Sequence, residues 1–384
     1  MQNKVLFCAT VDHHFESFHI PYLKWFKEQG WRVHVAANGN VSLPYVDQKF
    51  NLSIQRSPFS LKNIKAYKEL KEIINQNQYQ MIHCHTPMGG VLTRIAARNQ
   101  RKFGSKVLYT AHGFHFFKGA PLINWALYYP IEKMLAKYTD CLITINKEDF
   151  YLANNRQFKA DYIKHVHGVG INTEVFSRIE PLQKAVLRQK HGYKQEDFLL
   201  FYAAEFNKNK NQQMLIKAVA NIKQEVPNAK LLLAGDGPLL ENCKKLALKL
   251  GLKDMVHFLG FRLNIDEFLK ISDLAVASSY REGLPVNIME AMASGLPVLA
   301  SDNRGHRELI INDKNGWLIK ADHVGQMSEK IKILVQHEEL RSRFGKMSRK
   351  IIEETYSIEK TLKEKSLLYS MLMEELEERE WAVH

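Results

Sequence analysis

Two glutamates, Glu282 and Glu290, stand eight residues apart in a stretch whose composition suits an anionic ligand. An apolar run at 274–277 precedes them, Pro285 fits the first turn of a helix, and Gly295 can end that helix. The first amides of such a helix and its dipole favour an anion such as a phosphate. Eight helical residues separate the carboxylates by about 12 Å, which is too far for one shared proton or metal ion.

These carboxylates can accept hydrogen bonds from hydroxyl groups at the two ends of an extended ligand. A carboxylate accepts from two vicinal hydroxyls, so one glutamate suits a sugar and the other a ribose, with a diphosphate between them. The alternative is an ordinary helix, with Glu282 in its first turn and Glu290 solvated on its polar face. The spacing alone does not choose between these interpretations.

The composition is that of a globular protein with a basic surface. The 384 residues predict two domains of about 150–200 residues each. Four scattered cysteines without a Cys-x-x-Cys pair fit a reducing cytoplasm, and we expect neither a signal peptide nor a membrane-spanning helix. The net charge of +13 favours an anionic partner: a nucleotide sugar, a lipid diphosphate, an acidic membrane face or a nucleic acid. Basic and acidic residues alternate along the helices and no nucleic-acid-binding motif is present, which disfavours nucleic acid.

Apolar runs that alternate with helical patterns predict a doubly wound α/β domain in each half of the chain. Buried parallel strands are expected in the first half at 4–10, 32–37, 81–84, 106–110 and 141–145. In the second half they are expected at 198–204, 230–234, 256–259 and 274–277. Ligands bind beyond the carboxyl ends of such strands, so the residues that follow each strand are the informative ones.

The segment around the two glutamates resembles the retaining glycosyltransferases of family 4. Their frame is Glu-Gly-(Leu/Phe)-Pro followed by Glu-Ala-Met-Ala-(Ser/Cys)-Gly-(Leu/Lys)-Pro-Val, and residues 282–298 read EGLPVNIMEAMASGLPV. The resemblance extends over nearly the whole chain and is closest to bacterial enzymes that build exopolysaccharide or capsule repeat units. It implies the GT-B fold, an α/β fold in which two doubly wound Rossmann-like domains face each other across a cleft.

The same resemblance implies where the domains divide. Residues 166–173 resemble the family's interdomain linker. We therefore expect an acceptor-binding domain over 1–175 and a domain that binds the nucleotide sugar over 176–355. A C-terminal helix over 356–384 is expected to cross back onto the first domain.

On the donor side, the resemblance assigns Glu282 to the sugar hydroxyls and Glu290 to the ribose. Lys210 would contact the diphosphate, where a cation neutralises the leaving group as the sugar–phosphate bond breaks. Backbone amides after Glu282 would join it, and the expected donor-binding positions there are Gly283, Leu284 and Pro285, of which Pro285 has no N–H to donate. Glu205 departs from the family pattern, because relatives carry an arginine at that position, and Lys208 is a candidate to replace the missing charge.

Three further positions belong to the expected nucleotide end of the site. Gly235 and Gly237 follow the strand at 230–234 and would permit a tight turn. Phe261 lies in the loop that the family places against the nucleobase. A Gly-x-Gly pair without a third glycine is weak evidence by itself, so these assignments rest on the resemblance.

On the acceptor side, His112 and Gly113 match a family position whose histidine lies beside the donor sugar. The expected catalytic residues are therefore His112 and Glu282. Many relatives have a glycine-rich loop after the first strand, but residues 11–15 contain no glycine. Contact with an acceptor would then use side chains, with His13 and His14 as candidates.

Several histidines raise the alternative of a zinc site. Two histidines spaced two apart in a strand point to the same side. The candidates are His83, His85, His112, His115, His165 and His167. The family needs no metal and no nearby Asp, Glu or Cys completes a ligand set, so we expect no metal and no cofactor.

Residues 119–134 are apolar nearly all round and include Trp125, Tyr128 and Tyr129. One interpretation is a helix buried in the first domain. The other is a surface that meets the lipid part of an acceptor or the membrane interface, where such aromatic residues are common. Lysines within 62–71 would add attraction to anionic headgroups.

The resemblance and the residues together predict a retaining hexosyl- or N-acetylhexosaminyltransferase. It would move a sugar from a UDP-sugar such as UDP-GlcNAc to a glycan on a lipid diphosphate, in exopolysaccharide or capsule biosynthesis. Such an enzyme would be cytoplasmic and peripheral at the inner face of the cell membrane. The alternatives are a UDP-sugar 2-epimerase-like enzyme, which needs no acceptor, and a non-catalytic sugar-nucleotide-binding protein.

Overall fold

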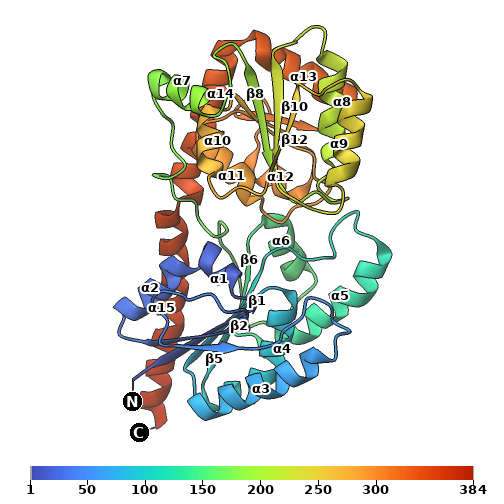
Figure 1. Cartoon of the computed structure of the whole chain (residues 1–384). Coiled ribbons are helices and arrows are strands. Elements are labelled where there is room, and N and C mark those ends of the chain that lie inside the picture. The colour runs from blue at the N-terminus through green and yellow to red at the C-terminus, as the bar shows by residue number, and fades with distance from the viewer. Residues whose placement is uncertain (1, 384) are drawn as a thin grey trace. The chain divides into compact units, whose positions relative to one another are not determined.

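The computed structural model describes residues 2–383, with side chains through residue 378, and divides into two compact α/β units. The first unit is the chain up to Gly170 together with the chain from Ile358 onward (Figure 1). The second unit runs from Ile171 to Ser357. The divisions therefore fall a few residues away from the expected boundaries near 175 and 355, and each unit is described separately.

The first unit is built on a seven-stranded parallel sheet in the order β3-β2-β1-β4-β5-β6-β7. Its strands are β1 (Lys4–Val11), β2 (Arg32–Asn38), β3 (Gln48–Asn51), β4 (Met81–His85), β5 (Lys106–Ala111), β6 (Cys141–Thr144) and β7 (Tyr162–His165). The strand order reverses between β1 and β4. The crevice beyond the carboxyl ends of these two strands is therefore the topological switch point, where doubly wound sheets bind ligands.

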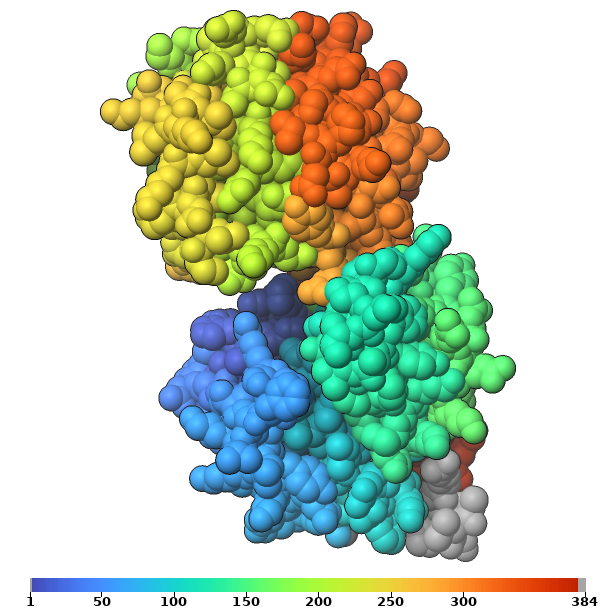
Figure 2. Space-filling model, turned by 90° about the vertical axis from the view of Figure 1, so that its right-hand side faces the viewer, coloured from blue at the N-terminus to red at the C-terminus, as the bar shows by residue number. Residues whose placement is uncertain are grey.

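Helices cover this sheet, and α5 (Leu122–Leu135) leaves apolar side chains in solvent. Leu122 is 86% exposed and Ile123 is 68% exposed, whereas Trp125 and Tyr129 pack against the core. The interpretation of this segment as a buried helix is therefore wrong. Figure 2 views this side of the first unit, with the α5 segment in teal. The other helices are α1 (His13–Phe18), α2 (Ile20–Glu28), α3 (Lys62–Asn77), α4 (Pro87–Ala97), α6 (Lys147–Asn155) and α15 (Ile358–Val383).

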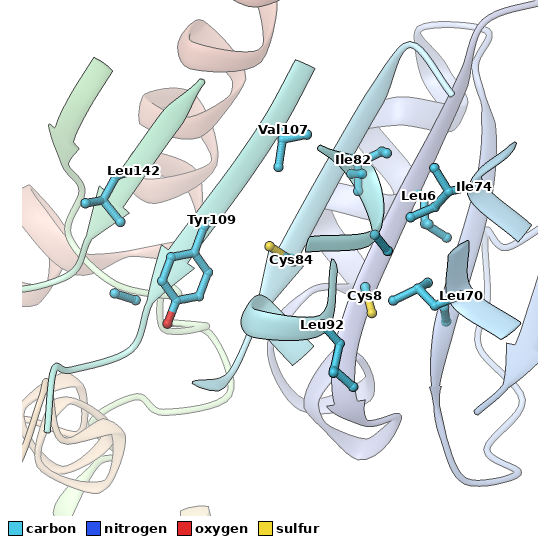
Figure 3. Close-up of a cluster of buried hydrophobic side chains, with 14 of the residues drawn as sticks. Leu6, Cys8, Leu70, Ile74, Ile82, Cys84, Leu92, Val107, Tyr109 and Leu142 are labelled. Atoms are coloured by element: carbon cyan, nitrogen blue, oxygen red, sulfur yellow. The ribbon is translucent and has the colours of Figure 1, made fainter. Parts of the chain in front are cut away.

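The core of the first unit lies between the central strands and helices α3 and α4. Figure 3 shows side chains of β1, β4 and β5, among them Leu6, Ile82 and Val107, in the same cluster as Leu70 and Ile74 of α3. Central strands of a parallel sheet are buried on both faces, which explains why they are continuous apolar runs in the sequence. The four cysteines are free and buried. Among residues 2–383, no helix is both long and apolar enough to cross a membrane.

The C-terminal helix α15 belongs to the first unit. Tyr369 shares a hydrogen bond of 2.8 Å between its hydroxyl and His83 Nδ1 in β4. The Tyr162 hydroxyl in β7 donates to Glu375 Oε1 at 2.7 Å. Residues almost 300 positions apart in the chain thus share one core, and α15 covers the side of the sheet where His83 points.

The second unit is built on a six-stranded parallel sheet in the order β10-β9-β8-β11-β12-β13. Its strands are β8 (Phe198–Ala203), β9 (Ala229–Ala234), β10 (Val256–Gly260), β11 (Leu274–Ala277), β12 (Val298–Ser301) and β13 (Gly316–Ile319). Its helices are α7 (Pro181–Lys190), α8 (Gln212–Ile222), α9 (Leu240–Lys249), α10 (Ile265–Ile271), α11 (Val286–Ala293), α12 (Arg304–Leu309), α13 (Val324–Gln336) and α14 (Glu338–Ile351). The order reverses between β8 and β11, so the loops after these strands form the switch point.

Candidate active-site residues

Lys210 and Glu282 form an ion pair at the switch point of the second unit. Lys210 Nζ lies 2.5 Å from Glu282 Oε1, and the side chains are 22% and 14% exposed. Lys210 lies in the loop between β8 and α8, and Glu282 lies in the loop between β11 and α11. Because β8 and β11 are neighbours in the sheet, the two loops meet although their residues are 72 positions apart. The structure thus brings together two residues that the sequence assigned to one donor site.

Hydrogen bonds fix these two loops to each other. The Tyr280 amide donates to the Asn209 carbonyl at 2.8 Å, and the Asn209 side-chain amide donates to the Arg281 carbonyl at 3.0 Å. The Ser278 hydroxyl donates to the Lys210 carbonyl at 2.8 Å. Sequence reasoning missed Asn209 and Ser278 as supporting residues. Asn209 could have been found as a polar residue directly beside Lys210, and Ser278 as a polar residue directly after the predicted strand at 274–277.

The start of α12 packs against Glu282. A Cβ atom at Gly305 would lie 2.7 Å from Glu282 Cβ, so only glycine lets the helix approach this closely. Arg304 Nε donates to the Glu282 carbonyl at 3.1 Å. The Asn303 side-chain amide donates to the Ser279 carbonyl at 2.9 Å. The backbone on both sides of Glu282 is therefore held in place before any ligand binds.

Glu290 lies in α11 in a partly buried environment. Its carboxylate forms no hydrogen bond or ion pair within residues 2–378. Burial raises the pKa of Glu290 to about 7. Glu290 is therefore less solvated than the alternative of a glutamate on a polar helix face expects. A carboxylate that lacks protein partners is suited to accept hydrogen bonds from a ligand diol.

The residues between the two glutamates lead directly into α11. Pro285 is the N-cap of this helix rather than a residue of its first turn, and Leu284 is buried. No side chain caps α11 at this end. Gly283 and Leu284 thus lead to a helix start whose first amides can donate hydrogen bonds to an anion.

Gly235 and Gly237 are required by the packing of two loops. Their φ angles are +135° and +149°. A Cβ atom would lie 2.2 Å from the Ala204 carbonyl oxygen at the first position and 2.6 Å from the Phe206 carbonyl oxygen at the second. These glycines therefore let the loop after β9 pass against the loop after β8, and through it they help to position Glu205.

Glu205 and Phe261 both face solvent. Glu205 accepts a hydrogen bond of 2.9 Å from the Asn207 side-chain amide, and within residues 2–378 no basic side chain pairs with it. Phe261 is 71% exposed just after β10, which leaves its ring face available for stacking. Lys208 is also exposed and forms no ion pair in the described part of the chain. Its charge is available near the Lys210–Glu282 pair.

His112 follows β5 in the first unit and faces other histidines. Its Nε2 lies 3.4 Å from His85 Nδ1, and its ring centroid lies 4.7 Å from that of His14. Burial lowers the pKa of His112 well below its usual value, so its ring is neutral near pH 7. Gly113 has a φ of +124°, a conformation that favours glycine, and this explains the His-Gly pair.

His13 and His14 differ in their surroundings although they are adjacent. The side chain of His13 is 73% exposed and its Nδ1 lies 2.8 Å from Glu16 Oε2. His14 turns inward, and its Nε2 lies 3.1 Å from His19 Nε2. Sequence reasoning did not select His19, which is buried between α1 and α2.

The remaining histidines of the zinc alternative lie in separate places. His83 is hydrogen-bonded to Tyr369 and to Thr110, both at 2.8 Å. The His115 ring stacks on Tyr128 with 4.7 Å between centroids. His165 and His167 form another pair, with 4.9 Å between centroids. The set suggested by i, i+2 spacing is therefore not one cluster.

Two doubly wound parallel sheets, with an ion pair at the switch point of the second, define the chain as a GT-B protein. The profile of the group described as glycosyl transferase 4-like matches residues 4–146. The profile of glycosyl transferases group 1 matches residues 183–351. The chain therefore belongs to the group 1, or family 4, glycosyltransferases and is a glycosyltransferase.

Individual relatives agree with this assignment. The chain is 49% identical to EpsD of Bacillus subtilis (strain 168) over 374 residues, which are 97% of this chain and 98% of EpsD. It is 28% identical over 268 residues to the UDP-Gal:alpha-D-GlcNAc-diphosphoundecaprenol alpha-1,3-galactosyltransferase of Escherichia coli, covering 69% of this chain and 68% of that enzyme. Anabaena HepE in complex with UDP superposes with a TM-score of 0.79 at 19% identity, over 97% of this chain and 100% of HepE, and shares its fold.

Proposed function

We propose that this enzyme transfers a sugar from a UDP-sugar to a saccharide carried on a lipid diphosphate, with retention at the anomeric carbon. The observation that carries the proposal is the Lys210–Glu282 pair beside an uncapped helix start, with the unpaired Glu290 carboxylate further along that helix. HepE was crystallised with UDP and with UDP-glucose, and the E. coli relative uses UDP-Gal and a diphosphoundecaprenol-linked acceptor by name.

In the proposed donor complex, Lys210 and the first amides of α11 bind the diphosphate. The positive charge stabilises the leaving nucleoside diphosphate as the sugar–phosphate bond breaks. Glu282 holds the sugar hydroxyls, Glu290 holds the ribose diol and Phe261 stacks on the nucleobase. Donor binding then exchanges the Lys210–Glu282 contact for contacts of each residue with a different part of the donor.

On the acceptor side, His112 acts beside the donor sugar as a neutral hydrogen-bonding group. Gly113 supplies the backbone turn that presents it. The leaving phosphate accepts the proton of the acceptor hydroxyl, so the transfer requires no side-chain base. His13, which is exposed, is the better placed of the two acceptor-side candidates, because His14 points into the histidine cluster.

A lipid-linked acceptor brings the enzyme to a membrane, and the surface of the first unit fits anionic lipid. The exposed apolar residues Leu122 and Ile123 of α5 are suited to the interface. A second group stands at the start of α3, where Phe59 and Leu61 are 82% and 80% exposed. Lysines of α3 follow that group along the helix, namely Lys62, Lys65, Lys68 and Lys71. Figure 2 displays both segments, α5 in teal and the start of α3 in blue.

The first experiment is thermal denaturation with UDP, GDP and ADP, each with and without magnesium. A ligand that binds only the folded state raises the melting temperature by mass action. We expect a rise with UDP alone, independent of magnesium and reduced in Lys210→Met, with Lys208→Met as the matched control. No rise with any nucleotide would contradict the proposed donor site.

A second assay separates transfer from epimerisation. The enzyme is incubated with a UDP-sugar, with and without a GlcNAc-diphospholipid acceptor. We expect a new glycosidic bond with the donor's anomeric configuration, formed only when the acceptor is present. Conversion of the UDP-sugar without acceptor would instead identify a 2-epimerase. Tight UDP binding with no turnover on any acceptor would identify a non-catalytic binding protein.

A further inference from the structure

Four histidines of the first unit converge on one point. His14, His19, His85 and His112 each offer a ring nitrogen, and the four nitrogens lie within 4.8 Å of one another. They come from α1, the N-cap of α2, the end of β4 and the residue after β5. Four separate chain segments therefore meet at the topological switch point through imidazole groups.

Two pairs of these nitrogens have the spacing found in the coordination sphere of a small metal ion, and all four lie within 4.8 Å of one another. Zinc binds histidine nitrogen at about 2.0–2.1 Å in a tetrahedron, which places neighbouring nitrogens about 3.3 Å apart. The His14–His19 and His85–His112 nitrogens are separated by 3.1 Å and 3.4 Å. An oxyanion would need donors about 2.8 Å outside its own oxygens, and therefore more widely spread. The geometry favours a metal ion over an anion.

The four rings are in the chemical state that metal binding requires. Burial lowers the pKa of His14 to about 4 and holds those of His19, His85 and His112 well below the usual value. The rings are therefore neutral near pH 7 and carry free electron pairs. The His85 nitrogen that faces His112 is Nδ1, so Nδ1 is the candidate ligand atom of this ring.

The surroundings hold the rings in place. The His85 ring is parallel to the Phe7 ring at 6.3 Å between centroids, and it lies 4.1 Å from the His83 ring. His83 is itself fixed by hydrogen bonds to Tyr369 and Thr110. Ligand rings that cannot turn lose little freedom when an ion binds, and an apolar wall keeps water away.

We propose that His14, His19, His85 and His112 form a binding site for one zinc ion in the first unit. The ion ties α1 and α2 to the ends of β4 and β5 and fixes the ring of His112. This differs from the expectation of no metal, which rested on the family's lack of a metal and on the absence of a nearby Asp, Glu or Cys to complete a ligand set. The proposal does not depend on the proposed donor site, whose residues lie in the second unit.

The positive charge of Lys365, in α15, disfavours a metal ion at the proposed site. Its Nζ is buried without a hydrogen-bond partner in the described part of the chain, 4.3 Å from the centroid of the Tyr22 ring. Burial lowers the pKa of Lys365 to about 7. A buried positive charge in this unit disfavours a cation nearby, so its removal should strengthen zinc binding. The other titratable groups that interact with Lys365 are Glu364, Tyr22, His14, His19, His83 and His112.

The test uses the purified full chain, stripped with a chelator and titrated with Co²⁺, which absorbs strongly in the visible range when tetrahedral. We expect one Co²⁺ per chain, displaced by Zn²⁺. His19→Ala should weaken binding by about 100-fold or more, because even outer-shell partners contribute about 10–100-fold. His165→Ala is the matched control and should bind like the wild type. Lys365→Met should tighten binding below pH 7.

Two further measurements keep the test decisive if His19→Ala fails to fold. His14→Cys retains a ligand atom and should keep the ion with an added sulfur-to-cobalt absorption band. Zinc content of the wild-type protein after growth in zinc-containing medium should approach one per chain. No saturable binding, an octahedral Co²⁺ spectrum, or equal binding in His19→Ala and His165→Ala would overturn the proposal. Stabilisation by inorganic phosphate that is lost in Lys365→Met, without any metal binding, would overturn it in favour of an anion site.

UDP binding measured on the same variants separates this proposal from the proposed function. The melting-temperature rise with UDP should be the same in His19→Ala and the wild type, because the proposed UDP ligands lie in the second unit. A wild-type protein that binds Co²⁺ but not UDP would contradict the donor site and leave the metal site standing. A wild-type protein that binds UDP but not Co²⁺ would contradict the metal site and leave the donor site standing.

Discussion

Lys210 and Glu282 are bound to each other across two loops of the second unit, with Lys210 Nζ 2.5 Å from Glu282 Oε1. Both side chains are largely buried, so neither charge is well screened by water. In the proposed function, Lys210 binds the diphosphate and Glu282 binds the sugar hydroxyls. The pair keeps both side chains in place and compensates both charges before the donor arrives.

Glu282→Gln should separate donor binding from turnover. The amide removes the negative charge that competes with the diphosphate for Lys210, so UDP affinity should stay equal or increase. Transfer should fall by about 100-fold or more, the magnitude seen when one transition-state contact is lost. Binding is measured by calorimetry and turnover by UDP release. The exposed Glu205→Gln is the control, and wild-type turnover in Glu282→Gln would show that the site is wrong.

Lys210→Met should weaken the binding of UDP but not of uridine. A hydrogen bond to a charged group contributes about 1.5–3 kcal/mol, which corresponds to a loss of about 10- to 150-fold in UDP affinity. Uridine lacks the diphosphate and should bind both proteins equally. Lys208→Met, in the same loop, is the matched control. Equal losses for UDP and uridine would place Lys210 away from the diphosphate.

Glu290 should make UDP affinity depend on pH. Its pKa is raised to about 7 by burial, so the carboxyl is largely protonated at pH 6 and ionised at pH 8. The ionised form accepts both hydrogen bonds of a ribose diol, so affinity should rise with pH through 7. Glu290→Gln should remove that component, while ionisation of UDP itself affects both proteins alike. Identical pH profiles of the dissociation constant in the two proteins would contradict the ribose assignment.

The same pKa shift has a consequence for stability. A carboxyl whose pKa is raised by folding binds its proton more tightly in the folded state than in the unfolded state. Glu290 therefore lowers the free energy of unfolding as pH rises from 4.5, the ordinary pKa of a glutamate, to about 7. Glu290→Gln should be more stable than the wild type at pH 8 and nearly equal to it at pH 4.5. Melting temperatures at the two pH values check this sign.

A buried ion pair should control the stability of the first unit. Arg94 Nη2 donates to Glu132 Oε2 at 2.8 Å, and the Tyr109 hydroxyl donates to Glu132 Oε1 at 3.2 Å. Arg94→Met leaves the Glu132 carboxylate buried without its cation and should cost about 3–5 kcal/mol. The double variant with Glu132→Leu should recover much of that loss. Scanning calorimetry checks this, and a small effect of Arg94→Met alone would contradict it.

Membrane binding should depend on the lysines of α3. A quadruple charge reversal should abolish most binding to vesicles of anionic lipid, with Glu in place of Lys62, Lys65, Lys68 and Lys71. Each basic residue near such a surface contributes about 1 kcal/mol to binding. Reversal at four exposed lysines of the second unit is the matched control: Lys217, Lys249, Lys253 and Lys314. Co-sedimentation with vesicles at constant salt measures the effect. Equal binding of the two quadruple variants would exclude α3 as the contact surface.

In the first unit, the central strands were predictable from the sequence and the edge strands β3 and β7 were not. In the second unit, the edge strand β10 was expected at 256–259, whereas the buried central strand β12 was not expected. The runs expected at 4–10, 81–84 and 106–110 are confirmed by β1, β4 and β5 within one or two residues. β3 and β7 were missed because they are short and only partly buried, so they carry polar residues and no continuous apolar run. The pattern of apolar residues reports burial, and in the first unit it fades where a strand has a free edge.

The proposed donor-site residues were selected through the family frame, and the residues that contact them were not. The sequence selected Lys210 and Glu282 separately. Their contact depends on the adjacency of β8 and β11, which no local pattern specifies. Gly305 was visible only as part of a family motif. Its physical reason, the close approach to Glu282 Cβ, requires coordinates.

The sequence by itself determined the class of fold and the family, because these follow from local patterns of apolar residues and from a motif of fixed spacing. The donor-site residues that the same motif selects remain a prediction. Sequence reasoning listed His85 and His112 with other histidines of a zinc alternative, named His14 only as an acceptor-side candidate and did not select His19. Tertiary structure decided that His85 meets His14, His19 and His112. Such convergence depends on strand order, which places residues from distant parts of the chain at one end of a sheet.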